Sequence, residues 1–273
     1  MLGQYLITFR EVLEAALITS IVLAYLSRTG RSGLSRYVWY GVFSAVGASV
    51  VLGAVIISVY GDLSESMKPL FEGVAALIAV AVLSSMIYWV ATRGKGLKAE
   101  VERRVESITT GGAALGLVSF AFVAVFREGL ETVLFLIPFL VEDAVATVGG
   151  LLLGTLTSVL LAYAIFFAGM KISIRRFFYF TSILLVLLAG GLAGYGVHEL
   201  VEYSGADAWG WLGQRAYNLN IPLENPLHHN GLVGSIFAVM FGYTVSAEWA
   251  RVIVHLSYLI LALPLVLRVY RKK

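Results

Sequence analysis

The chain reads FREVLE at residues 9–14 and FREGLE at residues 126–131, with five of six positions identical. Each copy lies inside a long apolar stretch, where a charged side chain costs roughly 2.5–3.5 kcal/mol on membrane-insertion scales. Three charged residues in each of two such stretches therefore require an explanation. Because the same six-residue pattern recurs 117 residues later, we infer an internal duplication of the chain.

The composition is that of an integral membrane protein. Of 273 residues, 59% are hydrophobic and 14% are charged, whereas soluble domains have about 45–50% and about 25%. A soluble enzyme is excluded. The chain has no Cys, so any metal must be bound by oxygen or imidazole. The formal charge of +3 comes from basic residues in short loops, so we expect no nucleic-acid partner.

Apolar stretches separated by polar residues predict an all-α, multi-pass protein of the cytoplasmic membrane, surrounded by lipid bilayer. The first stretch lacks a basic leader and a cleavage site, so we expect it to be a permanent helix. Seven spans are predicted: Gly3–Leu26, Tyr37–Tyr60, Pro69–Ala91, Gly111–Val141, Ala144–Met170, Phe177–Val201 and Trp249–Tyr270.

The distribution of Lys and Arg predicts the orientation of the chain. Alternate loops hold fifteen of them on one side and two, Lys68 and Arg215, on the other. The positive-inside rule makes the richer side cytoplasmic, with the N-terminus outside and the C-terminus inside. The fifteen are Arg28, Arg31, Arg36, Arg93, Lys95, Lys98, Arg103, Arg104, Lys171, Arg175, Arg176, Arg268, Arg271, Lys272 and Lys273.

Three crossings separate the two motifs, so the motifs run through the membrane in opposite directions. This predicts a single permease domain, 1–273, built on an inverted repeat of three helices, with the binding site near the midplane. The first repeat is expected at 1–92 and the second at 108–203. An extracytoplasmic loop follows at 204–247, with a short surface or re-entrant helix over Leu232–Tyr243, and then a seventh helix with a basic tail at 248–273.

Within each motif, helical spacing places the carboxylates on one face. Glu11 and Glu14 are three residues apart, and Arg10 lies four residues before Glu14. The second motif repeats this with Arg127, Glu128 and Glu131. If the helices meet at their motifs, four carboxylates and two guanidiniums carry a formal charge of −2, which a hard cation such as Fe³⁺, Mn²⁺, Mg²⁺ or Ca²⁺ would offset. Intrahelical salt bridges alone, or a proton relay, are the simpler alternatives.

These motifs resemble those of the oxidase-dependent iron transporter family, the high-affinity ferric iron permeases, which carry Arg-Glu-x-x-Glu in their first and fourth spans. Further similarity lies in Leu70–Gly73, with Met86 and Trp89 later in the same span, and in Phe241–Tyr243. The resemblance implies inward transport of Fe³⁺, with the motif glutamates as metal ligands. It also implies a ferroxidase or an extracytoplasmic iron-delivery protein as partner, although this chain lacks the long extracytoplasmic domain of some bacterial relatives.

Two secondary sites follow from the positions of other charged residues. Glu72, near the outer end of the third span, is either a fifth metal ligand or a simple interfacial carboxylate. His198, Glu199 and Glu202 share a helical face near the outer end of the sixth span. They are either a cation-collecting group or an exposed polar helix end.

Two other readings remain open at this stage. Helical glutamates also build membrane-embedded di-metal oxidases, but those sites use Glu-x-x-His spacing and neither motif contains His. A permease for another cation, such as lead or manganese, would use the same carboxylates. We expect no enzyme activity and no organic cofactor, since the chain has no nucleotide-binding loop. The sequence assigns no oligomeric state.

Overall fold

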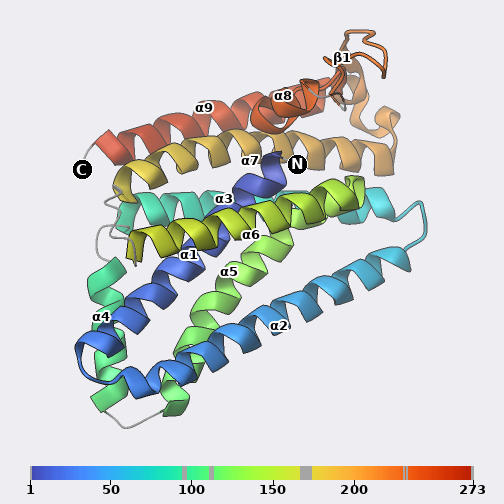
Figure 1. Cartoon of the computed structure of the whole chain (residues 1–273). Helices are drawn as coiled ribbons and strands as arrows, with labels where there is room; N and C mark the ends of the chain where they lie inside the picture. The colour runs from blue at the N-terminus through green and yellow to red at the C-terminus, as the bar shows by residue number, and fades with distance from the viewer. Residues whose placement is uncertain are drawn as a thin grey trace.

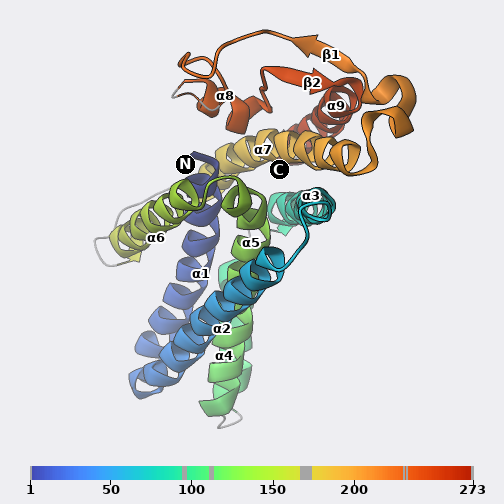
Figure 2. The ribbon, with the colours of Figure 1, turned by 90° about the vertical axis from the view of Figure 1, so that its right-hand side faces the viewer.

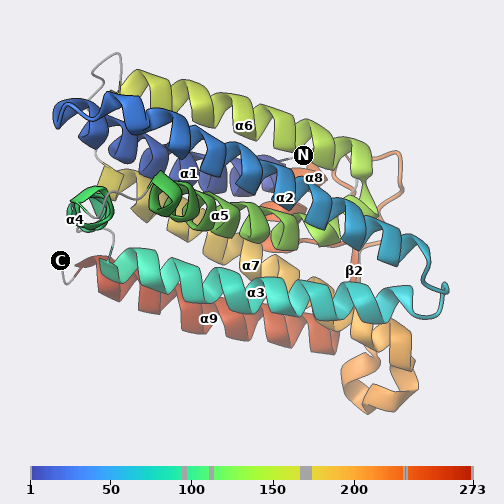
Figure 3. The same ribbon diagram turned by 90° about the horizontal axis from the view of Figure 1, so that it is seen from below.

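The computed structural model describes residues 2–93, 97–110, 114–166, 174–229, 231 and 233–271. Its fold is a bundle of long helices in which α3, α6, α7 and α9 run in a similar direction and α1, α2 and α5 are inclined to them (Figure 1, Figure 3). The long helices are α1 (Leu2–Arg28), α2 (Ser35–Gly61), α3 (Lys68–Arg93), α5 (Ala114–Glu142), α6 (Ala144–Phe166), α7 (Ile174–Ser204) and α9 (Trp249–Arg271).

The prediction of an all-α polytopic membrane protein is confirmed. By length and composition, five helices of the described residues can cross a membrane: α2, α3, α6, α7 and α9. The other two long helices, α1 and α5, are the ones that carry the charged motifs in mid-helix. Each predicted span falls within one of the long helices. Two predicted limits, the start of the fourth span at Gly111 and the end of the fifth at Met170, lie outside the described residues.

The long helices pair through close backbone approaches. α1 packs on α6, α2 on α5, and α3 on α7, while α9 covers α7. Gly154 of α6 lies against the backbone of α1 at Tyr5 and Phe9. The Ser158 hydroxyl donates to the Phe9 carbonyl at 2.5 Å. Small residues allow such contact because a larger side chain would hold the helices apart.

Apolar side chains on several long helices point away from the bundle. Large exposed hydrophobic residues are concentrated on α2 and α6, with more on α9. A surface this apolar is costly in water and favourable in hydrocarbon. The members on the first two helices include Tyr40, Phe43, Val50, Val51, Val55, Leu152, Leu156 and Leu160, and those on α9 include Leu256, Ile260 and Leu261.

A shorter helix, α4 (Leu97–Thr110), was missed by the span analysis because it is too short and too polar to cross a membrane. Val101 and Val105, four residues apart, are buried against residues of α1, α2 and α5. The Arg28 guanidinium contacts the Glu102 carboxylate at 2.6 Å, and Arg31 donates to the Thr109 hydroxyl. The apolar spacing in a charged segment was the available signal for an amphipathic helix.

The segment between α7 and α9 forms a separate layer (Figure 2). It contains the 3-10 helix η2 (Ala206–Gly213), the strands β1 (Arg215–Asn218) and β2 (Ser246–Glu248), and helix α8 (Gly234–Phe241). The strands pair antiparallel, with Asn218 opposite Ser246. The short helix predicted over Leu232–Tyr243 is therefore found as α8; Leu232 lies outside the described residues. α8 contacts α7 and the start of α1.

The structure explains the one position at which the two motifs differ. Gly129 replaces the Val12 of the first copy, and a Cβ at Gly129 would overlap the side chain of Ser49 on α2. That serine is buried and fixed by a hydrogen bond to the Ala45 carbonyl at 2.9 Å. The second motif therefore requires glycine so that α2 can pack on α5.

We expect Gly129→Val to lower the free energy of unfolding by about 1–3 kcal/mol, because the added side chain overpacks the contact between α2 and α5. The measurement is thermal unfolding of the purified protein in detergent. Gly47→Val is the matched control, since a Cβ at Gly47 meets no atom within 4 Å. Equal unfolding temperatures for the two variants would contradict the prediction.

Candidate metal centre

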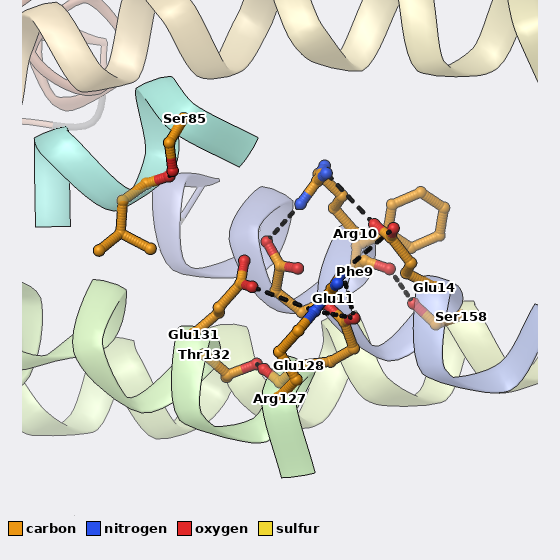
Figure 4. A network of polar contacts seen from close by, with 11 residues as sticks. Phe9, Arg10, Glu11, Glu14, Ser85, Arg127, Glu128, Glu131, Thr132 and Ser158 are labelled. Atoms are coloured by element: carbon orange, nitrogen blue, oxygen red, sulfur yellow. Dashed lines mark hydrogen bonds and ion pairs between the residues drawn. The ribbon is translucent and has the colours of Figure 1, made fainter. Parts of the chain in front are cut away.

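Glutamates of both motifs meet between α1 and α5. Glu11, Glu128 and Glu131 each offer a carboxylate oxygen, and these oxygens lie within 4.8 Å of one another. Figure 4 shows side chains from the two helices directed toward a common point. All three glutamates are buried, and Glu11 is 0% exposed. The structure therefore joins residues more than 110 positions apart in the chain into one acidic group.

The first arginine is buried with its glutamates. Arg10 is 2% exposed, and its Nη1 donates to Glu11 Oε1 at 2.7 Å. Its Nη2 lies 3.2 Å from Glu14 Oε2, four residues along the helix. A guanidinium held between two carboxylates fixes their orientation and offsets part of their charge.

The second arginine links the two helices. Arg127 Nη2 lies 2.8 Å from Glu128 Oε1, and Arg127 Nε lies 3.5 Å from Glu131 Oε1. The same guanidinium reaches α1, with Nη2 at 3.9 Å from Glu14 Oε1. It also lies over the Trp89 ring of α3, 5.3 Å from its centroid. Unlike Arg10, the Arg127 side chain is 45% exposed.

Glu14 has a different position from the other three glutamates. It is buried, but its oxygens face the two guanidiniums and it is not a member of the three-carboxylate group. Within the described residues, Glu14 therefore acts as a counter-ion that bridges the two arginines. It does not lie at the point where Glu11, Glu128 and Glu131 meet.

One oxygen of each motif glutamate has no hydrogen-bond partner. In the described part of the chain, Oε2 of Glu11, Glu14, Glu128 and Glu131 is buried without a hydrogen-bond partner, and of these only Glu14 Oε2 lies in an ion pair, with Arg10 Nη2 at 3.2 Å. A buried neutral acceptor without a hydrogen bond costs about 1–3 kcal/mol, and a buried charged acceptor costs more. Three carboxylates around one point, with Glu14 and the two arginines beside them and a formal charge of −2 for all six groups, suit a hard metal cation bound by oxygen.

Glu72 lies away from this group. Its Oε1 accepts a hydrogen bond from the Tyr60 hydroxyl at 2.7 Å, and its Oε2 accepts one from the Tyr195 hydroxyl at 2.5 Å. On α3 it is 17 residues from Trp89, which contacts Arg127, so about 25 Å of helix separates the two. The structure does not bring Glu72 to the motif glutamates.

The group near the C-terminal end of α7 is brought together. His198, Glu199 and Glu202 each offer a ligand atom within 4.8 Å of the others. His198 Nδ1 lies 3.1 Å from Glu248 Oε2 on β2, which sequence reasoning did not include because 50 residues separate the two. This hydrogen bond holds the pKa of the Glu248 carboxyl below its usual range.

A cavity of about 430 Å³ lies between the motif glutamates and the layer formed by α8 and the β strands. It is lined by residues from α1, α5, α6, α7, α8 and α9, among them Gln4, Asp143 and Arg251. His229 also lines it, and burial lowers the pKa of this imidazole. Sequence reasoning missed the cavity, because its lining residues become neighbours only when the helices pack.

A helical membrane protein with a buried, unbalanced carboxylate group in mid-bundle belongs to the class of metal-ion transporters. The particular family is defined by comparison with known proteins. A model of the iron permease FTR1 family matches residues 1–269, and the chain belongs to that family. Iron transport across a membrane, by a transporter rather than an enzyme, is the activity that this membership supports.

Relatives align over nearly the whole chain. A protein of Archaeoglobus fulgidus, described as uncharacterized, is 46% identical over 99% of this chain and 96% of its own. The ferrous iron permease EfeU of Yersinia pestis is 34% identical over 96% and 92%. The protein of the same name from Escherichia coli O6:H1 is 33% identical over 96% and 94%. No solved structure matches the chain.

The contact between His198 and Glu248 makes stability depend on pH. A carboxyl with a lowered pKa stabilises the fold when ionised, and this contribution is lost as pH falls through that lowered pKa. We expect Glu248→Gln to lower the free energy of unfolding at pH 7 by less than about 1 kcal/mol, since the pair is partly exposed. The difference from the native protein should shrink as pH falls and vanish well below the ordinary glutamate pKa of about 4.3, because the pKa of Glu248 in the folded protein is lower than that. Thermal unfolding at both pH values measures it, and an unchanged difference at low pH would refute the assignment.

Proposed function

We propose that this chain is a seven-span permease of the cytoplasmic membrane that moves Fe³⁺ inward through the motif glutamates. The observation that carries the proposal is the group of three buried carboxylates from α1 and α5, each with one oxygen that lacks a hydrogen-bond partner among the described residues, and the buried carboxylate of Glu14 beside them. Glu11, Glu128 and Glu131 act as first ligands, and Glu14 joins them when iron displaces it from the arginines. Arg10 and Arg127 keep the carboxylates oriented and limit their mutual repulsion.

The arrangement of helices supports an inverted repeat of α1, α2 and α3 against α5, α6 and α7. Exchanging the two repeats converts the pair α1–α6 into the pair α5–α2, and both pairs are present. The pair α3–α7 is exchanged with itself. In such transporters the site lies where the repeats meet, and α1 and α5 contact each other at the motifs.

Charge distribution supports the proposed orientation. The turn between α1 and α2, helix α4 and the end of α9 lie at one end of the bundle (Figure 1), and these are segments rich in Lys and Arg. The opposite end holds the turn between α2 and α3 and the layer formed by α8 and the β strands. The positive-inside rule places the first end in the cytoplasm.

Fe²⁺ is a second candidate for the cargo, on two observations. The named relatives from Yersinia pestis and Escherichia coli are described as ferrous iron permeases. A divalent ion would also bring the formal charge of the site to zero, whereas Fe³⁺ would bring it to +1. Fe³⁺ is favoured by an all-oxygen, carboxylate-rich ligand set with no imidazole among its members.

The oxidation state determines which partner is needed. Free ferric iron is supplied by oxidation of ferrous iron or by release from a carrier, so an Fe³⁺ permease works beside a ferroxidase or an extracytoplasmic iron-delivery protein. An Fe²⁺ permease needs neither. Lead and manganese remain alternatives of the same ligand chemistry, to be tested by competition.

We expect Glu11→Gln and Glu131→Gln each to reduce iron uptake more than about tenfold, since each removes a charged ligand. Uptake of radioactive iron into proteoliposomes is the measurement. Glu131→Asp keeps the charge and should retain more activity than Glu131→Gln. Glu224→Gln, at an exposed loop position, is the control. Full uptake by both glutamine variants would overturn the assignment of the site.

The oxidation state is tested with the same vesicles. Uptake is compared between Fe³⁺ under oxygen and Fe²⁺ kept reduced by ascorbate under nitrogen. If the cargo is Fe³⁺, uptake occurs under oxygen and is blocked by Ga³⁺, a trivalent ion that cannot be reduced under these conditions. Uptake only with ascorbate, blocked by Mn²⁺ and unaffected by Ga³⁺, would assign the ferrous ion instead.

A further inference from the structure

Three turns of α1 carry buried oxygen atoms without a hydrogen-bond partner. In the described part of the chain these are Oε1 of Gln4, Oγ1 of Thr8 and Oε2 of Glu11. Gln4 is 5% exposed and Thr8 is 0% exposed. Buried polar atoms are nearly always paired, so unpaired ones indicate water or an ion that the protein atoms alone do not include. Three in succession along one helix indicate a path.

The three residues follow one side of α1. Thr8 comes four residues after Gln4, and Glu11 three residues after Thr8, which is the spacing of neighbours on one helical face. Seven residues of helix rise about 10 Å, so the polar side spans the distance between the cavity and the carboxylates. The upper member, Gln4, lines the 430 Å³ cavity, and the lower member, Glu11, is part of the three-carboxylate group.

The facing helix α5 has one backbone carbonyl that lacks its helical donor near the cavity. Pro138 of α5 also lines the cavity, and proline has no N–H to donate to the carbonyl four residues earlier, that of Leu134. Leu134 lies one turn beyond Glu131, between this carboxylate and the cavity. A backbone carbonyl without its helical partner is tolerated inside a membrane where the backbone lines a cavity, as it does at Pro138.

From these contacts we propose that iron reaches the motif glutamates through this cavity, and that Gln4 and Thr8 line the access route as positioning residues. The inference rests on the proposed function. The cavity receives the hydrated cation, and the side chains of Gln4 and Thr8 replace part of its water shell as it moves along α1 toward Glu11. Both groups offer neutral oxygen atoms, which bind a hard cation more weakly than a carboxylate does and so let it pass.

The charges of the cavity fit a receiving chamber rather than a final binding site. Asp143 and Arg251 both line it, so their formal charges cancel. His229 on the same wall has a lowered pKa because of its burial and the neighbouring His228 and Arg251. A chamber without net negative charge holds a cation loosely, and tight binding begins only at the carboxylates.

The test uses Thr8→Val, which replaces the unpaired hydroxyl by a methyl group of similar size. If Thr8 lines the route, uptake into proteoliposomes falls about fivefold, the effect of one lost hydrogen bond on a rate. Equilibrium binding of iron to the purified protein stays unchanged, because the carboxylates are intact. Thermal stability stays equal or rises, since the variant no longer buries an unpaired hydroxyl.

Two further variants complete the design. Gln4→Leu should also slow uptake without loss of iron binding, and Gln4→Asn, which retains an amide, should restore part of the rate. Thr132→Val is the matched control. Thr132 is likewise buried in mid-bundle, but its hydroxyl already donates to the Glu128 carbonyl at 2.7 Å. It should transport at the native rate.

The outcomes separate this inference from the proposed function. If the native protein transports iron and both Thr8→Val and Gln4→Leu take it up at the same rate, the proposed route is wrong and the proposed permease function still stands. Loss of equilibrium iron binding in Thr8→Val would also overturn it, because the hydroxyl would then belong to the binding site. Absence of uptake and of iron binding in the native protein would instead reject the proposed function.

Discussion

The structure depends on placing four carboxylates and two guanidiniums inside an apolar helical bundle. Arg10, at 2% exposure, and Arg127 each contact glutamates of their own helix, and Arg127 also approaches Glu14 across the interface. These contacts satisfy only one oxygen each of Glu11, Glu128 and Glu131, whose Oε2 atoms have no hydrogen-bond partner among the described residues. Such an arrangement is costly for a protein that needs stability alone, because apolar residues of similar volume would pack at least as well. The cost is understandable when the site must bind and release a cation.

Two of the remaining helices hold the motif helices in place. α6 supports α1 through the contact of Ser158 with the Phe9 carbonyl, next to the first motif. α2 supports α5 through the close approach of Ser49 and Gly129, inside the second motif. Each motif helix is therefore held by one partner at the level of its charges. A site built on rigid helices keeps its ligands in place while the cation exchanges.

The two ends of the bundle have different chemistry. At the end opposite the basic segments, the cavity, the His198 group and the covering layer of α8 and the β strands lie close to α7. At the basic end, α4 packs apolar residues against α1, α2 and α5. Polar groups thus extend from one side toward the carboxylates, and buried valines and leucines close much of the other. This asymmetry agrees with a cation that approaches the carboxylates from the side of the cavity.

The sequence by itself determined the class of protein, the approximate helix limits and the identity of the motif residues, because hydropathy and a repeated charged hexapeptide are local properties of the chain. It missed α4, whose polar face conceals a helix held by contacts with α1, and it placed Glu72 among the ligand candidates on position alone. Only the tertiary structure decided which carboxylates converge and that two tyrosine hydroxyls donate hydrogen bonds to Glu72. It also placed Gln4 at a cavity, with Thr8 between Gln4 and Glu11 along α1. These facts depend on how α1, α5 and α7 pack, and helix packing joins residues that no sequence spacing relates.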